Sequence, residues 1–121
     1  MAESCEQRGC CGVQYAVEAD GSVYPCDFYV MDEYQIGNFN TDSFDQMDQK
    51  RSEIRFIEQS SQVEEACISC PYFLLCRGGC RRNRGNGMQT EPTRNNFCEG
   101  YKIFFEKWYD TLMQLGKLVQ R

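Results

Sequence analysis

The sequence contains no histidine among its 121 residues. Any metal site in this chain must therefore use thiolate or carboxylate ligands. The sequence also lacks an excess of basic residues, because 13 Lys and Arg stand against 18 Asp and Glu, for a formal net charge of −5. A nucleic-acid-binding domain would need the opposite balance. No run of 18 apolar residues is present, so the sequence predicts no membrane span and no nucleic-acid partner.

The N-terminal segment, residues 1–9, is polar and lacks the apolar centre of a signal peptide. We therefore expect a reducing, cytoplasmic compartment. The chain length fits a single domain over residues 1–121. Hydrophobic residues make up 41% of the chain, a little below the usual globular share. A core of this size needs help from cross-links or metal.

Cysteine is abundant, with nine residues in 121. The first group is Cys5-x4-Cys10-Cys11, then x14 to Cys26; the second is Cys67-x2-Cys70-x5-Cys76-x3-Cys80, then x17 to Cys98. The odd count, the polar N-terminus and the long helical segments argue against a secreted disulfide scaffold. Two four-cysteine zinc sites fit the count as well as two iron–sulfur clusters do, but the wide, irregular spacings favour clusters.

The pattern of residues predicts an α+β domain, with a small β-hairpin and helices around two metal sites and a long C-terminal helix. The hairpin spans residues 13–25, because apolar and polar residues alternate there and Asp20-Gly21 favours a turn. The ends of a hairpin lie side by side, so we expect Cys11 and Cys26 to be close in space. Residues 28–40 are expected to be irregular, with a turn at Gly37-Asn38.

Two helices are predicted beyond the hairpin. Residues 43–58 form the first, with Ser43 and Gln46 as a capping box and a break near Lys50. Residues 60–65 are a polar link, residues 67–80 a dense metal loop and residues 81–93 a surface loop. The last helix begins near residue 97, where Asn95 or Asn96 can cap it. Its aromatic stripe is expected to pack inward on its own domain.

The cysteine pattern resembles the SPASM domain, the C-terminal auxiliary-cluster domain of radical S-adenosylmethionine enzymes. The matching residues are Cys11, Gly21, Cys26, Cys67, Cys70, Cys76, Cys80 and Cys98, with Cys5 upstream. The stretches YPCDFYV (24–30), CRGGCRRNR (76–84) and NFCEGYKIFF (96–105) resemble one subfamily, the anaerobic sulfatase-maturating enzymes. The resemblance covers the chain from Cys5 to about Tyr109.

This resemblance implies a crossed set of ligands for two 4Fe–4S clusters. The first cluster would take Cys5, Cys11, Cys26 and Cys80, and the second Cys67, Cys70, Cys76 and Cys98. Spacing alone also permits an uncrossed pairing in which Cys80 and Cys98 are exchanged. Cys10 is left over, as a small side chain, a free thiol or a substitute ligand. The resemblance also makes Asp27 the catalytic base, whereas the plainer interpretation is a solvated carboxylate at the hairpin end.

The Cys-x3-Cys-x2-Cys motif of the S-adenosylmethionine site is absent, because Asn83 stands where the third cysteine after Cys76 and Cys80 would fall. A chain of 121 residues also has no room for the catalytic barrel. We therefore expect the C-terminal third of a larger enzyme, inactive alone, with S-adenosylmethionine bound only in the missing N-terminal barrel. Its partners would be that barrel and a sulfatase-type peptide or protein.

The function implied by the resemblance is electron transfer and substrate deprotonation while a sulfatase Cys or Ser is oxidised to Cα-formylglycine. Two alternatives stay open: a structural zinc or iron–sulfur module that recognises a peptide, and the SPASM domain of another peptide-modifying radical enzyme. Metal content separates the structural alternative from the first function. The arginines at 77, 81, 82 and 84 either form a solvated loop or screen cluster charge. Gly78-Gly79 allows close backbone approach and N–H bonds to sulfur.

Overall fold

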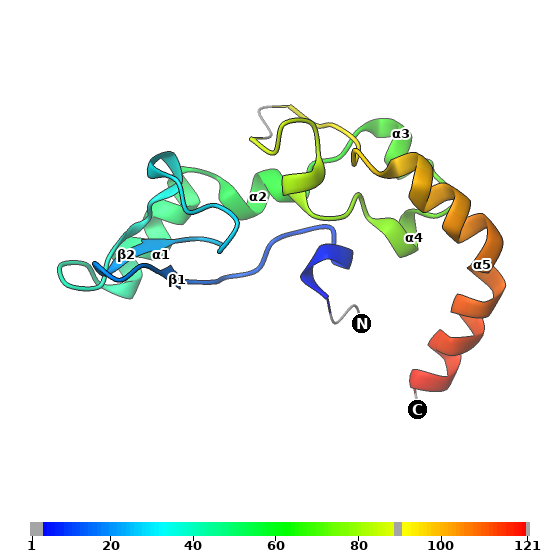
Figure 1. Cartoon of the computed structure of the whole chain (residues 1–121), viewed down its shortest axis with the longest axis horizontal. Helices are drawn as coiled ribbons and strands as arrows, with labels where there is room; N and C mark the ends of the chain where they lie inside the picture. The colour runs from blue at the N-terminus through cyan, green and yellow to red at the C-terminus, as the bar shows by residue number, and fades with distance from the viewer. Residues whose placement is uncertain (1–3, 89–90, 121) are drawn as a thin grey trace.

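The computed structural model describes residues 4–88 and 91–120. A small antiparallel sheet lies at one end of an elongated molecule and a long helix at the other (Figure 1). The elements in order are η1 (Cys5–Gln7), β1 (Ala16–Val17), β2 (Ser22–Tyr24), η2 (Asp32–Tyr34), β3 (Gly37–Asn38), α1 (Phe44–Glu53), α2 (Phe56–Ser60), α3 (Glu65–Ile68), α4 (Phe73–Cys76), η3 (Arg81–Asn83) and α5 (Cys98–Val119). None of the helices in this described part is long and apolar enough to cross a membrane.

The predicted hairpin is confirmed, with shorter strands than expected. Strands β1 and β2 pair antiparallel, with Val17 opposite Val23. Gly21 adopts a φ of +88°, a left-handed conformation that favours glycine in the turn. The N–H of Ser22 donates to the carboxylate of Asp20 at 2.9 Å, which closes the turn from within. The hairpin is therefore specified by residues close in sequence.

A third strand, β3, occupies the position where a turn was expected. Gly37 pairs with Val23 across the sheet. A side chain at Gly37 would place its Cβ 2.6 Å from Cγ of Met47, so glycine lets α1 pack directly on the strand. The N–H of Asn38 donates to the Asp42 carboxylate at 2.8 Å. The expectation of a turn at Gly37-Asn38 is wrong, because contacts with β2 and α1 determine this strand.

Helix α1 begins as predicted and breaks later than predicted. Ser43 is its N-cap, and a capping box with Gln46 is present. The helix ends at Glu53 rather than near Lys50. Arg55 then adopts a φ of +53°, in the left-handed region that arginine seldom occupies, and α2 follows. The sequence holds no glycine at this break, which explains why the break was misplaced.

The core consists of two clusters of buried side chains. Val23, Ile36 and Met47 lie between the sheet and α1. Tyr29, Tyr34 and Phe56 form an aromatic cluster, in which the Tyr29 and Phe56 rings meet edge to face at 5.1 Å. Cys11 and Cys26 pack against this aromatic cluster. The aromatic cluster therefore provides a rigid support for these two cysteines.

Helix α5 runs along the far side of the molecule and only partly contacts it (Figure 1). Phe105 is buried, with its ring 5.9 Å from that of Tyr72. Phe104, Trp108 and Leu115 are 50%, 43% and 52% exposed. The prediction that the whole stripe packs inward is therefore wrong. The neighbouring helix α4 has four residues, too few to cover the 22 residues of α5.

The start of α5 also differs from the prediction. Its N-cap residue is Phe97, without a side-chain cap on the helix. The Asn95 side chain instead accepts a hydrogen bond from the N–H of Phe97 at 2.8 Å. The Asn96 amide donates to the carbonyl of Gly85 at 2.8 Å. Both asparagines thus shape the loop that leads into the helix.

Candidate metal centres

All nine cysteines are free of disulfides, and they line two separate pockets. Site I, a cavity of about 210 Å³, is lined by Cys5, Cys10, Cys11, Cys26 and Cys80. Site II is lined by Cys67, Cys70, Cys76 and Cys98. Within residues 4–88 and 91–120, no three Cys, Asp or Glu side chains converge closely enough to hold a single metal ion. The cysteines are distributed around the pocket walls instead.

Site I is formed by both ends of the hairpin and by two distant segments. Cys11 precedes the hairpin and Cys26 follows β2, so the predicted proximity of these two residues is confirmed. The N–H of Cys11 donates to Oγ of Ser60 at 2.7 Å, which fixes this backbone against the end of α2. Cys5 comes from η1, and Cys80 comes from the loop after α4. The exposed Cys10 also lines site I.

Burial favours the protonated form of two thiols of site I, those of Cys11 and Cys26. Burial raises the pKa of Cys11, although the Ser60 hydrogen bond and the positive charge of Arg81 act in the opposite direction. Burial also raises the pKa of Cys26 to about 11, and the Asp27 carboxylate adds to this effect. A metal must therefore displace protons from these thiols when it binds, because the thiolate is the ligand.

The predicted base Asp27 lies at the rim of site I. Its side chain is exposed, and its Oδ1 lies 3.4 Å from Sγ of Cys26. The neighbouring Phe28 is 52% exposed, and the Arg82 guanidinium covers its ring at 3.4 Å from the centroid. A carboxylate in this position is open to a substrate. The catalytic role of Asp27 stays a prediction.

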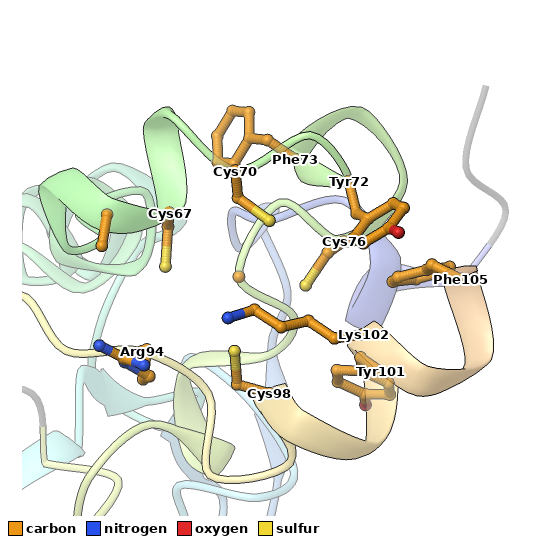
Figure 2. A pocket seen from close by; sticks show the side chains of 12 residues that line it. Cys67, Cys70, Tyr72, Phe73, Cys76, Arg94, Cys98, Tyr101, Lys102 and Phe105 are labelled. Atoms are coloured by element: carbon orange, nitrogen blue, oxygen red, sulfur yellow. The ribbon is translucent and has the colours of Figure 1, made fainter. Parts of the chain in front are cut away.

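Site II is built by two short helices and the start of the long helix α5. Cys67 lies in α3, Cys76 ends α4 and Cys98 begins α5, whereas Cys70 lies between α3 and α4. Figure 2 shows the four sulfur atoms facing a common space, into which the side chain of Lys102 extends. The four thiols are thus brought to one pocket by α3, α4 and the start of α5.

The groups around site II combine half-buried thiols with basic side chains. Burial raises the pKa of Cys67, and the nearby Cys98 adds to this effect. Burial also raises the pKa of Cys76, whereas a hydrogen bond from the Gly78 backbone acts in the opposite direction. This contact agrees with the N–H bond to sulfur expected at Gly78-Gly79. Arg94, which forms an ion pair with Glu64 at 3.0 Å, lines the same pocket.

Two arginines of the expected surface loop are buried. Arg81 and Arg84 are 1% and 0% exposed, whereas Arg82 is exposed as predicted. The Arg81 guanidinium lies 4.5 Å from the centre of the Phe56 ring, and its Nη1 donates to the Phe56 carbonyl at 2.7 Å. The solvated-loop interpretation is therefore wrong for these two residues. A run of arginines carries no periodicity that would distinguish buried from exposed members.

Comparisons with known proteins agree with this arrangement of cysteines. Residues 9–71 match the SPASM family, described as an iron–sulfur cluster-binding domain. The chain is 38% identical over 119 residues to the cysteine-type anaerobic sulfatase-maturating enzyme of Clostridium perfringens (strain 13 / Type A), covering 98% of this chain and 32% of that enzyme. It is 40% identical over 115 residues to the enzyme of the same description from Clostridium novyi (strain NT), covering 95% of this chain and 31% of that enzyme.

Solved structures give the same result. The structure described as native anSMEcpe with bound AdoMet and Cp18Cys peptide superposes with a TM-score of 0.84 at 39% identity, covering 98% of this chain and 33% of that chain. Native anSMEcpe with bound AdoMet superposes with a TM-score of 0.85 at 38% identity, covering 98% of this chain and 32% of that chain. The chain thus spans about a third of the length of the relatives it matches. It belongs to the SPASM family of iron–sulfur cluster-binding domains.

Proposed function

We propose that this chain is the auxiliary two-cluster domain of an anaerobic sulfatase-maturating radical S-adenosylmethionine enzyme. The enzyme would oxidise a cysteine or serine of a sulfatase to Cα-formylglycine. The observation that carries this proposal is the pair of cysteine-lined pockets in a chain 38% identical to such an enzyme over 119 residues. The solved structure that superposes on this chain with a TM-score of 0.84 contains a bound peptide, which supports a peptide substrate.

Each site would hold one 4Fe–4S cluster. The ligands would be Cys5, Cys11, Cys26 and Cys80 at site I, and Cys67, Cys70, Cys76 and Cys98 at site II. The crossed assignment is supported because Cys80 lines site I and Cys98 lines site II. Sites made of cysteine ligands alone suit 4Fe–4S clusters. The clusters would accept the electron that leaves the substrate. Cys10 lies close enough to site I to act as a substitute ligand.

Asp27 would act as the base in this reaction. Its carboxylate lies at the exposed rim of site I, beside a ligand and open to a bound peptide. As the aldehyde forms, the substrate thiol or hydroxyl must lose a proton, which a carboxylate in hydrogen-bonding reach can accept. The proposed proton acceptor, Asp27, therefore lies directly beside the proposed electron acceptor, the cluster of site I.

Besides the peptide substrate, this domain would contact the barrel domain of the same enzyme, where S-adenosylmethionine binds. The chain spans about a third of its relatives, which leaves room for such a domain in the whole protein. The exposed apolar side chains of α5, among them Phe104, Trp108 and Leu115, offer a surface that another domain could cover. A cytoplasmic location would keep the cysteine ligands reduced, as cluster binding requires.

Metal analysis of anaerobically purified protein tests the proposal. We expect about eight irons and about eight sulfides per chain, as two 4Fe–4S clusters require. Two zinc ions without sulfide would support the structural zinc module instead. Protein prepared in air is a poor sample for this measurement, since free thiolates also bind zinc.

A further inference from the structure

Arg84 is fully buried between site I and site II, and all its donors are used. A guanidinium carries five N–H donors. In this structure they reach five backbone carbonyl oxygens: Nε donates to Gly78 at 3.0 Å, Nη1 to Ser60 at 2.7 Å and to Gln62 at 3.1 Å, and Nη2 to Gly79 at 2.7 Å and to Gly9 at 3.4 Å. One side chain thus satisfies carbonyls from three separate parts of the chain.

The three segments that Arg84 joins are the ones that carry the cysteines. Gly9 directly precedes Cys10 and Cys11, and residues 78–79 lie between Cys76 and Cys80. Residues 60–62 connect α2 to the segment that leads to Cys67. Gly78 lines site II, whereas Ser60 and Gly79 line site I. The guanidinium therefore fixes the backbone of both sites at once.

The charge of Arg84 has no acidic partner in the described part of the chain. The ion pairs found there involve other residues. Burial lowers the pKa of Arg84, whereas negative charge on the sulfur atoms of Cys80 and Cys11 at site I and of Cys67 at site II acts in the opposite direction. A guanidinium stays protonated in proteins. A buried charge without a counter-charge is unfavourable, so an anion beside Arg84 would complete this arrangement.

We propose that Arg84 is a counter-cation shared by both cluster sites and a positioning residue for the segments that bear their ligands. This inference rests on the proposed function, because the counter-charge is that of the clusters. An oxidised 4Fe–4S cluster with four thiolates carries about −2 net, and reduction adds one more negative charge. A positive charge nearby stabilises the reduced form more than the oxidised form. Arg84 therefore raises the reduction potential of both clusters.

Redox titration of the anaerobically purified 121-residue chain, followed by electron paramagnetic resonance, tests this role. Arg84→Gln removes the charge and keeps a polar side chain. We expect the equilibrium constant for reduction of each cluster to fall about tenfold, which is ~59 mV for a one-electron couple. Arg82→Gln is the matched control, because it makes the same charge change at an exposed residue two positions away. Arg82→Gln should shift the reduction potential of either cluster much less than Arg84→Gln does.

Arg84→Lys separates charge from hydrogen bonding, because lysine keeps the charge but offers three donors instead of five. We expect this variant to keep both potentials of the parent chain and to retain less iron. Unchanged potentials in Arg84→Gln, or a shift at one cluster alone, would overturn the shared role. If Arg84→Gln retains no iron, Arg84→Lys decides: parental potentials of the clusters that it keeps support the proposal, and shifted potentials or complete loss of both clusters overturn it. A parent chain without iron and sulfide would instead overturn the proposed function, and this inference with it.

Discussion

The backbone N–H of Cys11 donates to the Ser60 hydroxyl at 2.7 Å, across 49 positions of sequence. Ser60 is 1% exposed, and its hydroxyl donates in turn to the carbonyl of Ile57 in α2. The short helix α2 therefore holds the start of the hairpin in place beside site I.

Removing this hydroxyl should weaken site I. Ser60→Ala leaves the N–H of Cys11 without its acceptor, which typically costs about 1–3 kcal/mol when the group is buried. We expect a lower free energy of unfolding and a selective loss of iron from site I. The control is Ser61→Ala, because the exposed Ser61 donates its hydroxyl to the local carbonyl of Glu58. Equal iron contents in the two variants would show that the Cys11 contact is unimportant for the site.

The crossed set of ligands can be tested by removing site II first. In a Cys67→Ala/Cys70→Ala background, the remaining iron should belong to site I. Adding Cys98→Ala should then cause no further loss, because Cys98 lines the pocket already emptied. Adding Cys80→Ala should remove the remaining cluster. The reverse pattern of iron contents would establish the uncrossed pairing.

Asp27→Asn in the whole enzyme should separate proton transfer from radical formation. The substitution keeps the shape of the side chain but removes the base, so formation of aldehyde should fall by about 10² or more. Cleavage of S-adenosylmethionine should continue, and the iron content should stay unchanged. Asp32→Asn, the same change at an exposed residue outside site I, is the control. Aldehyde formation at the normal rate would exclude Asp27 as the base, and loss of iron would make it structural.

The acid stability of the sheet end should depend on Asp48. Hydrogen bonds from Tyr15 and Arg51 hold the pKa of the Asp48 carboxyl below its ordinary value. A lowered folded-state pKa gives stability that is present above the unfolded value, about 3.9, and is lost as the pH falls through the folded value. Asp48→Asn should lower Tm at neutral pH and flatten the decline of Tm below about pH 4.

The matched control for this measurement is Asp110→Asn, which makes the same charge change at an exposed position of α5. Arg51 is 3% exposed and pairs with Asp48 at 2.7 Å, so the loss of Asp48 leaves a buried guanidinium without this acidic partner. Identical pH profiles of Tm for the two variants would contradict the role of Asp48.

Removing metal should unfold part of the chain. Helices α3 and α4 have four residues each, too short to persist without support. Bonds to metal would therefore supply much of the stability of residues 67–98. We expect the amide NMR signals of this region to lose dispersion after chelation, while part of α5 survives. A metal-free spectrum with full, unchanged dispersion would contradict this expectation.

The sequence predicted those features that depend on nearby residues. Asp20 and Gly21 specify the hairpin turn, and Ser43 with Gln46 specifies the start of α1. Cysteine spacing and the resemblance to a family together indicated which cysteines meet in each pocket. The assignment of individual ligands remains a prediction.

Features that depend on distant contacts were missed. Strand β3 exists because Gly37 lies against both β2 and Met47. The left-handed Arg55 has no local signal. Arg84 is buried because carbonyls from three segments surround it, and no property of the arginine run shows this. The open face of α5 was misjudged because amphipathic periodicity does not say which protein surface lies opposite.

Cys80, which lines site I, lies in the sequence between Cys76 and Cys98, which line site II. This order restricts where the chain can be cut without separating the cysteines of one site. Site I draws on residues 5–26 and on Cys80, whereas site II draws on residues 67–98. A cleavage in the link between α2 and α3 would leave the N-terminal piece without Cys80 and the C-terminal piece without Cys11. Neither piece would contain a whole site I, although the C-terminal piece keeps every cysteine of site II. The two pieces would therefore have to stay associated for site I to form.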